Sequence, residues 1–198
     1  MNILTLSDIE SGYLWNCRHQ LILKNVDLIL SCGDLDPNYL SFIATYTHAP
    51  VLYVHGNHDT CYDITPPEGC ICIEDRIYTY QGVRILGLGG SMRYKPGPHQ
   101  YTQSEMNRRV RKLWMKLHLH GGFDILLTHS PAFGIGDGTD LTHMGFQAFR
   151  RLIEQYEPYA MVHGHTHLNY STSYQRLREY QNTKIINAYE RYLLKIHP

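Results

Sequence analysis

Three histidines stand at alternate positions in the segment AMVHGHTHLN, which covers residues 160–169. They are His163, His165 and His167, and they end or follow a short apolar run. Imidazole is a common metal ligand in proteins and a frequent general acid or base. A triplet of this kind therefore indicates metal binding or proton transfer.

Four other polar segments follow apolar runs in the same way: Ser7-Asp8-Ile9-Glu10, Gly33-Asp34, Gly56-Asn57-His58-Asp59 and Thr128-His129-Ser130-Pro131. Loops at the carboxyl ends of strands in an open α/β sheet face one crevice. We therefore expect carboxylates, an amide and imidazoles to meet there. The candidate metal ligands are Asp8, Glu10, Asp34, Asn57, His129, His165 and His167.

Oxygen and nitrogen donors without thiolates argue against a closed structural zinc site and for an open site holding Mn, Fe, Zn or Mg. These donors are too many for one catalytic ion. Two ions that share a carboxylate, about 3.5–4 Å apart, would accommodate them, because one oxygen can then bridge both.

The apolar pattern predicts the elements that position these residues. Short β-prone runs alternate with helical patterns, which is typical of a βαβ sheet, but residues 69–90 read as successive strands, so the strand order should be mixed. Asp36 can cap a helix that begins at Pro37. Strands are expected at 2–7, 26–32, 50–55, 123–129, 159–164, 168–175 and 183–196, and helices near 104–118 and 143–156.

Composition limits the class of protein. With 198 residues and 43% hydrophobic residues, the chain predicts a single domain over residues 1–198. Lys plus Arg and Asp plus Glu both total 18, which argues against a long nucleic acid or an anionic membrane as partner. The sequence shows no leader-like or membrane-spanning run, so we expect a cytoplasmic protein. It does not predict the oligomeric state.

The order of the polar segments resembles the calcineurin-like metallophosphoesterases, whose pattern is D-x-H, G-D, G-N-H-[DE], a later His and G-H-x-H. The match runs from Asp8 to His167, and its spacing is similar to that of compact bacterial members. The resemblance implies a four-layer αββα sandwich, in which two mixed β-sheets are flanked by helices.

The same resemblance implies the ligand sets. Asp8, position 10, Asp34 and His167 would hold the first ion, and Asp34, Asn57, His129 and His165 the second. His58 would be the histidine that meets the substrate without binding metal.

Position 10 departs from the family pattern, because Glu10 stands where the family usually has His. A carboxylate there can still bind metal, and it favours Mn²⁺, Mg²⁺ or Fe over Zn²⁺. It also adds a negative charge, which should weaken phosphate attraction and the acidification of water. In the alternative, Glu10 turns away and caps backbone amides.

The sequence therefore predicts a hydrolase for a small phosphorylated substrate, with two divalent ions, Mn before Fe, Zn or Mg. A hydroxide that bridges the ions through Asp34 would attack phosphorus, and His58 would stabilise or protonate oxygen. The lower positive charge favours a phosphodiester slightly over a monoester. A metal-dependent nuclease and a non-catalytic protein-binding scaffold remain alternatives.

Other candidates have ordinary structural explanations. Asn57, His58, Arg93, His99 and His143 could contact substrate, the last three from the loops 89–101 and 133–143, where solvent exposure is an equal alternative. His55 and His163 could support the ligands that follow them or pack in the core. The basic residues of the helix near 104–118 are better explained as a solvated face than as a binding patch.

Overall fold

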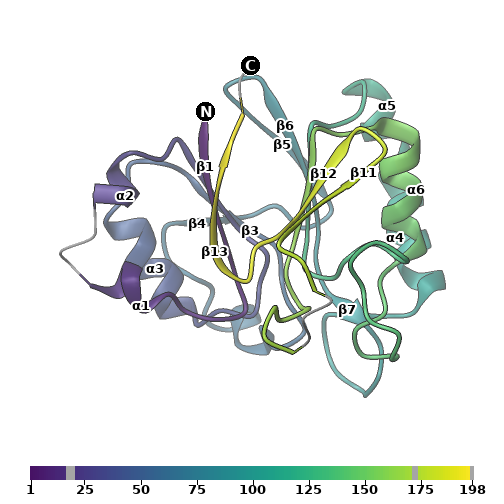
Figure 1. Ribbon diagram of the computed structural model, residues 1–198, viewed down its shortest axis with the longest axis horizontal. Helices are drawn as coiled ribbons and strands as arrows, with labels where there is room; N and C mark the ends of the chain where they lie inside the picture. Colours follow the sequence, from purple (N-terminus) through teal and green to yellow (C-terminus); the bar gives the residue numbers. More distant parts are fainter. Residues whose placement is uncertain (17–20, 171–173, 197–198) are drawn as a thin grey trace.

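The computed structural model describes residues 1–16, 21–170 and 174–196. Two large β-sheets lie face to face at the centre, and helices cover the outer face of each (Figure 1). The predicted four-layer sandwich of two mixed sheets is confirmed.

The first sheet has the strand order β13-β1-β2-β3-β4, in which β1 to β4 run parallel and β13 is antiparallel to β1. Its strands are β1 (Asn2–Ser7), β2 (Leu28–Ser31), β3 (Val51–Tyr53), β4 (Cys70–Cys72) and β13 (Glu190–Lys195). Its outer face carries α1 (Gly12–Trp15), α2 (Leu21–Lys24) and α3 (Pro37–Thr45).

The second sheet has the order β11-β12-β10-β9-β6-β5, with a parallel centre and an antiparallel strand at each edge. Its strands are β5 (Arg76–Tyr80), β6 (Val83–Leu88), β9 (Ile125–Thr128), β10 (Ala160–His163), β11 (Leu177–Tyr180) and β12 (Thr183–Asn187). Its helices are α4 (Gln103–Lys112), α5 (Trp114–Leu119) and α6 (Gln147–Tyr156). Three short elements complete the described chain: η2 (Thr60–Asp63), β7 (Ser91–Met92) and β8 (Gln100–Tyr101).

Strand alternation divides the apolar residues among three cores. In β2, Leu28 and Leu30 face the core between the sheets, whereas Ile29 faces the helices of the first sheet. In β9, Ile125 and Leu127 face the same inner core, and their neighbour on the strand faces α4 and α6. Because successive side chains point to opposite faces of a strand, each central strand can be buried on both sides.

Local signals explain where two helices begin. Asp36 caps α3 as predicted, because its Oδ1 accepts a hydrogen bond from the backbone N–H of Asn38 at 2.8 Å. Thr102 and Glu105 form a capping box at the start of α4. The predicted helix over 104–118 is in fact two helices, α4 and α5, that meet at Leu113.

The strand expected over 183–196 does not form as one element. The segment 183–196 forms two strands in different sheets, because Glu190 adopts a left-handed backbone (φ 62°) and the chain crosses from β12 to β13. The strand expected at 168–175 lies instead at β11, and the expected segment includes residues 171–173, outside the described residues. The crossing pairs β13 with β1 and so links the end of the chain to its beginning.

Candidate metal centre

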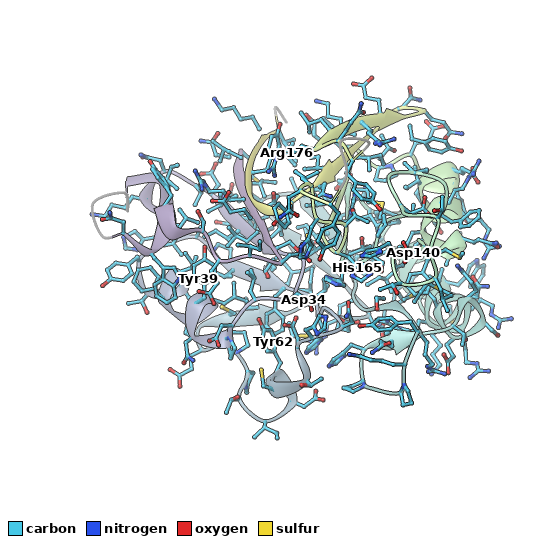
Figure 2. The ribbon with its side chains drawn as sticks, turned by 60° about the horizontal axis from the view of Figure 1, so that its bottom comes forward. Asp34, Tyr39, Tyr62, Asp140, His165 and Arg176 are labelled. Carbon is cyan, nitrogen blue, oxygen red and sulfur yellow. The ribbon has the colours of Figure 1, made fainter. Side chains whose placement is uncertain are left out.

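The polar segments meet at the carboxyl ends of the central parallel strands. Figure 2 shows Asp34 from the first sheet and His165 from the second sheet near each other at this edge. They line a cavity of about 410 Å³. Among the described residues, the lining consists of Asp8, Asp34, Asn57, His58, Tyr94, Thr142, His143, His165, His167 and Tyr170.

Three of the predicted ligands have an uncommon backbone conformation. Asp8, Asp34 and His165 have positive φ angles of 66°, 56° and 66°. A left-handed conformation costs a non-glycine residue about 1–3 kcal/mol and is found preferentially at functional sites. The surrounding loops therefore hold these side chains in a geometry that the isolated segments would not favour.

Backbone amides orient the two aspartates. Both carboxylate oxygens of Asp8 accept hydrogen bonds from the N–H of His165, at 3.0 and 3.1 Å. Oδ1 of Asp34 accepts from the N–H of His58 at 2.8 Å. Because these bonds join loops of different strands, they fix the carboxylates relative to the histidines.

Asp59 completes the turn behind Asp34. Its Oδ2 accepts hydrogen bonds from the N–H groups of Gly56 (2.7 Å) and Asp34 (2.9 Å). Burial and the nearby charge of Asp34 raise the pKa of Asp59 to about 6. Asp59 therefore closes the turn that carries Asn57 and His58.

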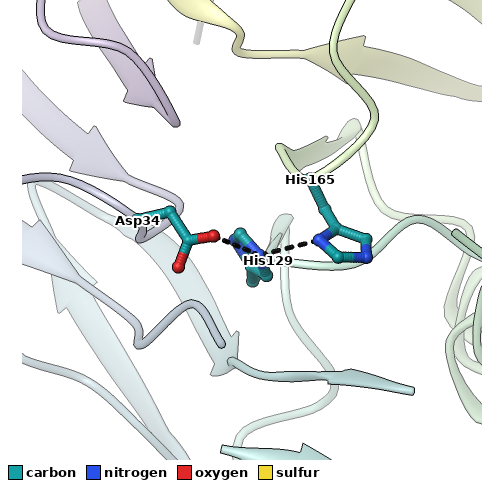
Figure 3. Close-up of side chains that lie close together, drawn as sticks. All are labelled: Asp34, His129 and His165. Atoms are coloured by element: carbon teal, nitrogen blue, oxygen red, sulfur yellow. Dashed lines mark hydrogen bonds and ion pairs between the residues drawn. The ribbon is translucent and has the colours of Figure 1, made fainter. Parts of the chain in front are cut away.

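His129 lies at the centre of the site and is fully buried. Its Nδ1 donates a hydrogen bond to the carbonyl of Cys32 at 2.8 Å, so in the neutral ring Nε2 carries a lone pair. That Nε2 lies 3.1 Å from His165 Nδ1 and 3.4 Å from Asp34 Oδ2 (Figure 3). It also lies 3.0 Å from Asn57 Oδ1. His165 Nε2 in turn donates to the carbonyl of Thr142 at 2.7 Å.

Four lone pairs thus point towards one another in a buried space. Unless a cation lies between them, these atoms repel, and a proton on His129 can satisfy only part of the set. Burial opposes that proton, but the charge of Asp34 outweighs burial and raises the pKa of His129 to about 9. Burial and the neighbouring His129 lower the pKa of His165 to about 4. The donor set fits a divalent ion.

The second group of predicted ligands is adjacent. His167 Nε2 lies 3.6 Å from Asp8 Oδ1, and the imidazole of His167 stacks on Tyr170 with 4.4 Å between ring centroids. Glu10 points elsewhere: its Oε2 accepts a hydrogen bond from the indole N–H of Trp15 at 2.8 Å. Its carboxylate does not line the cavity among the described residues, so ligation by Glu10 stays a prediction.

The candidate substrate-binding residues divide into two groups. His58 and His143 line the cavity, and His143 Nδ1 is held 3.0 Å from Asp140. Arg93 and His99 are not part of the described lining. The guanidinium of Arg93 pairs with Glu105 at 2.9 Å, and the ring of His99 stacks on that of His55.

Tyr94, Thr142 and Tyr170 line the cavity but were not singled out from the sequence. Asn57 Nδ2 donates to the hydroxyl of Tyr94 at 3.3 Å, which turns Asn57 Oδ1 towards His129. Tyr94 lies in the loop 89–101 and Thr142 in the loop 133–143, the two loops from which the sequence predicts substrate contacts. Their membership of these loops is the sequence signal for both residues.

Residues 1–188 match the family described as calcineurin-like phosphoesterase superfamily domain. The chain belongs to this superfamily. Its members typically bind divalent metals, and the convergent donors described above are candidate ligands for such ions in this chain. No curated protein sequence matches the chain.

Solved structures share the fold at low sequence identity. The protein TT1561 of Thermus thermophilus is 15% identical with a TM-score of 0.64, over 96% of this chain and 89% of that chain. A 5'-nucleotidase from Candida albicans is 13% identical with a TM-score of 0.56, over 94% of this chain and 45% of that chain. GAP50, described as the anchor in the inner membrane complex of Plasmodium, is 13% identical with a TM-score of 0.58, over 94% and 70%. At these identities the likeness shows the fold alone.

The described helices include none with the length and apolar character needed to cross a bilayer.

Proposed function

We propose that this phosphoesterase hydrolyses a phosphate ester at a centre for two divalent metal ions, with a phosphodiester favoured over a monoester. The observation that carries the proposal is the convergence of lone pairs at Asp34, Asn57, His129 and His165 beside a second pair of donors, Asp8 and His167. Glu10 is the remaining proposed ligand, at the first ion. Mn²⁺ is the preferred ion, because oxygen donors predominate there.

The protein's own residues would orient the reactants. Asn57 is fixed by Tyr94 and Asp34 by the backbone of His58, so neither has to reorganise when an ion binds. When bound, the ions supply positive charge for the phosphoryl oxygens and turn water into a nucleophile at neutral pH. His58, exposed at the cavity, is positioned to donate a proton to the departing oxygen.

The charge of the cavity supports the preference for a diester. Its described lining contains Asp8 and Asp34 but no Lys or Arg. The ions would therefore supply the strong positive charge that the described lining lacks. A monoanionic diester needs less compensation there than a dianionic monoester, so it should bind with the smaller electrostatic cost.

The test compares bis(p-nitrophenyl) phosphate with p-nitrophenyl phosphate. We expect a higher kcat/KM for the diester, loss of both activities in chelator and recovery with Mn²⁺. Asp34→Asn should lose metal and most activity, because Asp34 is the one proposed ligand of both ions. Asp36→Asn is the matched control, since Asp36 only caps α3 and Asn is an equally good cap.

Full activity in fresh chelator, or equal metal content in Asp34→Asn and wild type, would contradict the two-metal proposal. The same assay separates the alternatives. Cleavage of a polynucleotide in preference to the aryl diester indicates a nuclease, and stable metal binding without hydrolysis indicates a scaffold.

A further inference from the structure

A second group of metal-binding side chains lies outside the described cavity lining. His55, Asp63 and His99 each offer a ligand atom, and these atoms all lie within 4.8 Å of one another. His55 follows β3, Asp63 ends η2, and His99 precedes β8. Three separate segments therefore bring two imidazoles and a carboxylate together.

His55 is held in an orientation suited to a metal ligand. Its Nδ1 lies 3.3 Å from Oε2 of Glu74, and the same oxygen accepts a hydrogen bond from the backbone N–H of His55 at 3.2 Å. Glu74 is itself paired with Arg109, which keeps the carboxylate ionised. A carboxylate that accepts from one imidazole nitrogen leaves the other with its lone pair, as is typical of metal-bound histidines.

His99 carries the unexplained atom of the group. Its Nε2 is buried and has no hydrogen-bond partner among the described residues, and it lies 4.0 Å from Asp63 Oδ2. The ring is stacked on His55 with 4.3 Å between centroids and 3° between planes. Because buried polar atoms are nearly always satisfied, an orphaned imidazole nitrogen that lies near a carboxylate and a second imidazole indicates a place for a cation.

We propose that His55, His99 and Asp63 form a third metal position, separate from the phosphoesterase centre. Two nitrogens and one oxygen, with water completing the shell, suit Zn²⁺ or a similar late transition ion better than Mg²⁺ or Ca²⁺. The stacked rings must tilt to point at one ion. No described hydrogen bond restrains the ring of His99, and the side chain of Asp63 is 65% exposed, so both can adjust.

Such an ion would clamp the rim of the cavity. His99 belongs to the connection between β7 and β8, which also carries Tyr94, the partner of Asn57. His55 lies two residues before Asn57 in the chain. An ion shared by His55 and His99 would thus tie the segment that carries Tyr94 to the segment that carries Asn57.

The experiment measures zinc bound per chain after equilibration in a zinc buffer. We expect His99→Gln and Asp63→Asn each to hold about one equivalent less than wild type. His48→Gln is the matched control, because His48 is exposed and precedes β3, whereas His55 follows this strand. Asp34→Asn should keep the zinc equivalent that His99→Gln loses. The double variant Asp34→Asn/His99→Gln should lose the zinc of both sites, because the two sites share no ligand.

Equal zinc content in wild type, His99→Gln and Asp63→Asn would overturn the third position. Asp63→Asn decides the matter alone if His99→Gln fails to fold, since Asp63 is exposed. A negative result in this zinc measurement would not change the expected loss of activity in chelator or the expected loss of metal in Asp34→Asn. The third metal position and the proposed phosphoesterase centre can therefore fail independently.

Discussion

At the scale of single residues, the three alternating histidines have three different surroundings. His163 is buried with its Nδ1 2.9 Å from the carbonyl of Gly164, and burial lowers its pKa to about 4, so it remains neutral. His165 contributes a lone pair to the cluster around His129, whereas His167 faces Asp8. Similar spacing along the chain therefore does not imply a shared role.

Glu10 is the residue whose role a pair of variants can decide. If Glu10 leaves Trp15 to bind the first ion, Glu10→Ala should weaken one of the two metal positions. Trp15→Phe removes the same hydrogen bond but keeps the carboxylate and the ring packing against Phe42. We expect calorimetric titration with Mn²⁺ to show weaker binding in Glu10→Ala alone. Identical binding in both variants and wild type would leave Glu10 as a partner of Trp15 only.

At the scale of elements, the site depends on how closely the loops of the two sheets approach. A Cβ atom at Gly164, after β10, would lie 1.8 Å from Ser7 Oγ and 2.6 Å from Asp8 Oδ2. A Cβ at Gly56, after β3, would lie 2.0 Å from Asp34 Oδ1. Each loop thus leaves room for an aspartate that belongs to another strand.

Gly164→Ala should displace Ser7 and Asp8, because neither the end of β1 nor the end of β10 can retreat far. We expect about 1–3 kcal/mol lower stability, as for other overpacked sites, together with reduced metal content. Gly12→Ala is the control, because nothing lies within 4 Å of a Cβ there. Urea unfolding and metal analysis measure the two effects. A Gly164→Ala protein that binds metal like wild type would contradict the argument.

At the scale of the whole molecule, the candidate metal centre and a partly buried ion pair both connect segments of the two sheets. Glu74 lies where the chain passes from β4 in the first sheet to β5 in the second. It accepts from Gly89 N–H at 3.1 Å and pairs with Arg109 of α4. Burial opposes its charge, but His55 and Arg109 outweigh burial and lower its pKa from 4.5 to about 2.

Because the folded-state pKa of Glu74 is depressed, its stabilisation is complete above pH 4.5 and is lost as pH falls towards 2. A shift of this size corresponds to about 3 kcal/mol. We expect Glu74→Gln to lower the free energy of unfolding by about that amount at pH 7 and by little near pH 2. The exposed Glu68→Gln should change it little at either pH. Urea unfolding at the two pH values tests this, and a pH-independent loss would contradict it.

The sequence by itself determined the donor types and the strands that deliver them. Apolar runs that end in Asp, Asn or His predict strands and their loops without any distant contact. Side-chain alternation and strand-end loops are local properties of the chain. The family pattern and the helix cap at Asp36 could be predicted from the sequence for the same reason.

Only the tertiary structure decided how these donors face one another. The tautomer of His129 depends on the carbonyl of Cys32, 97 residues away, and the partner of β1 is β13 at the other end of the chain. The ring of His99 turned to that of His55 through a contact between separate segments that no periodicity encodes. Such orientations follow from packing between distant segments, where small differences in contact and hydrogen-bond energy choose among rotamers that the local sequence allows equally.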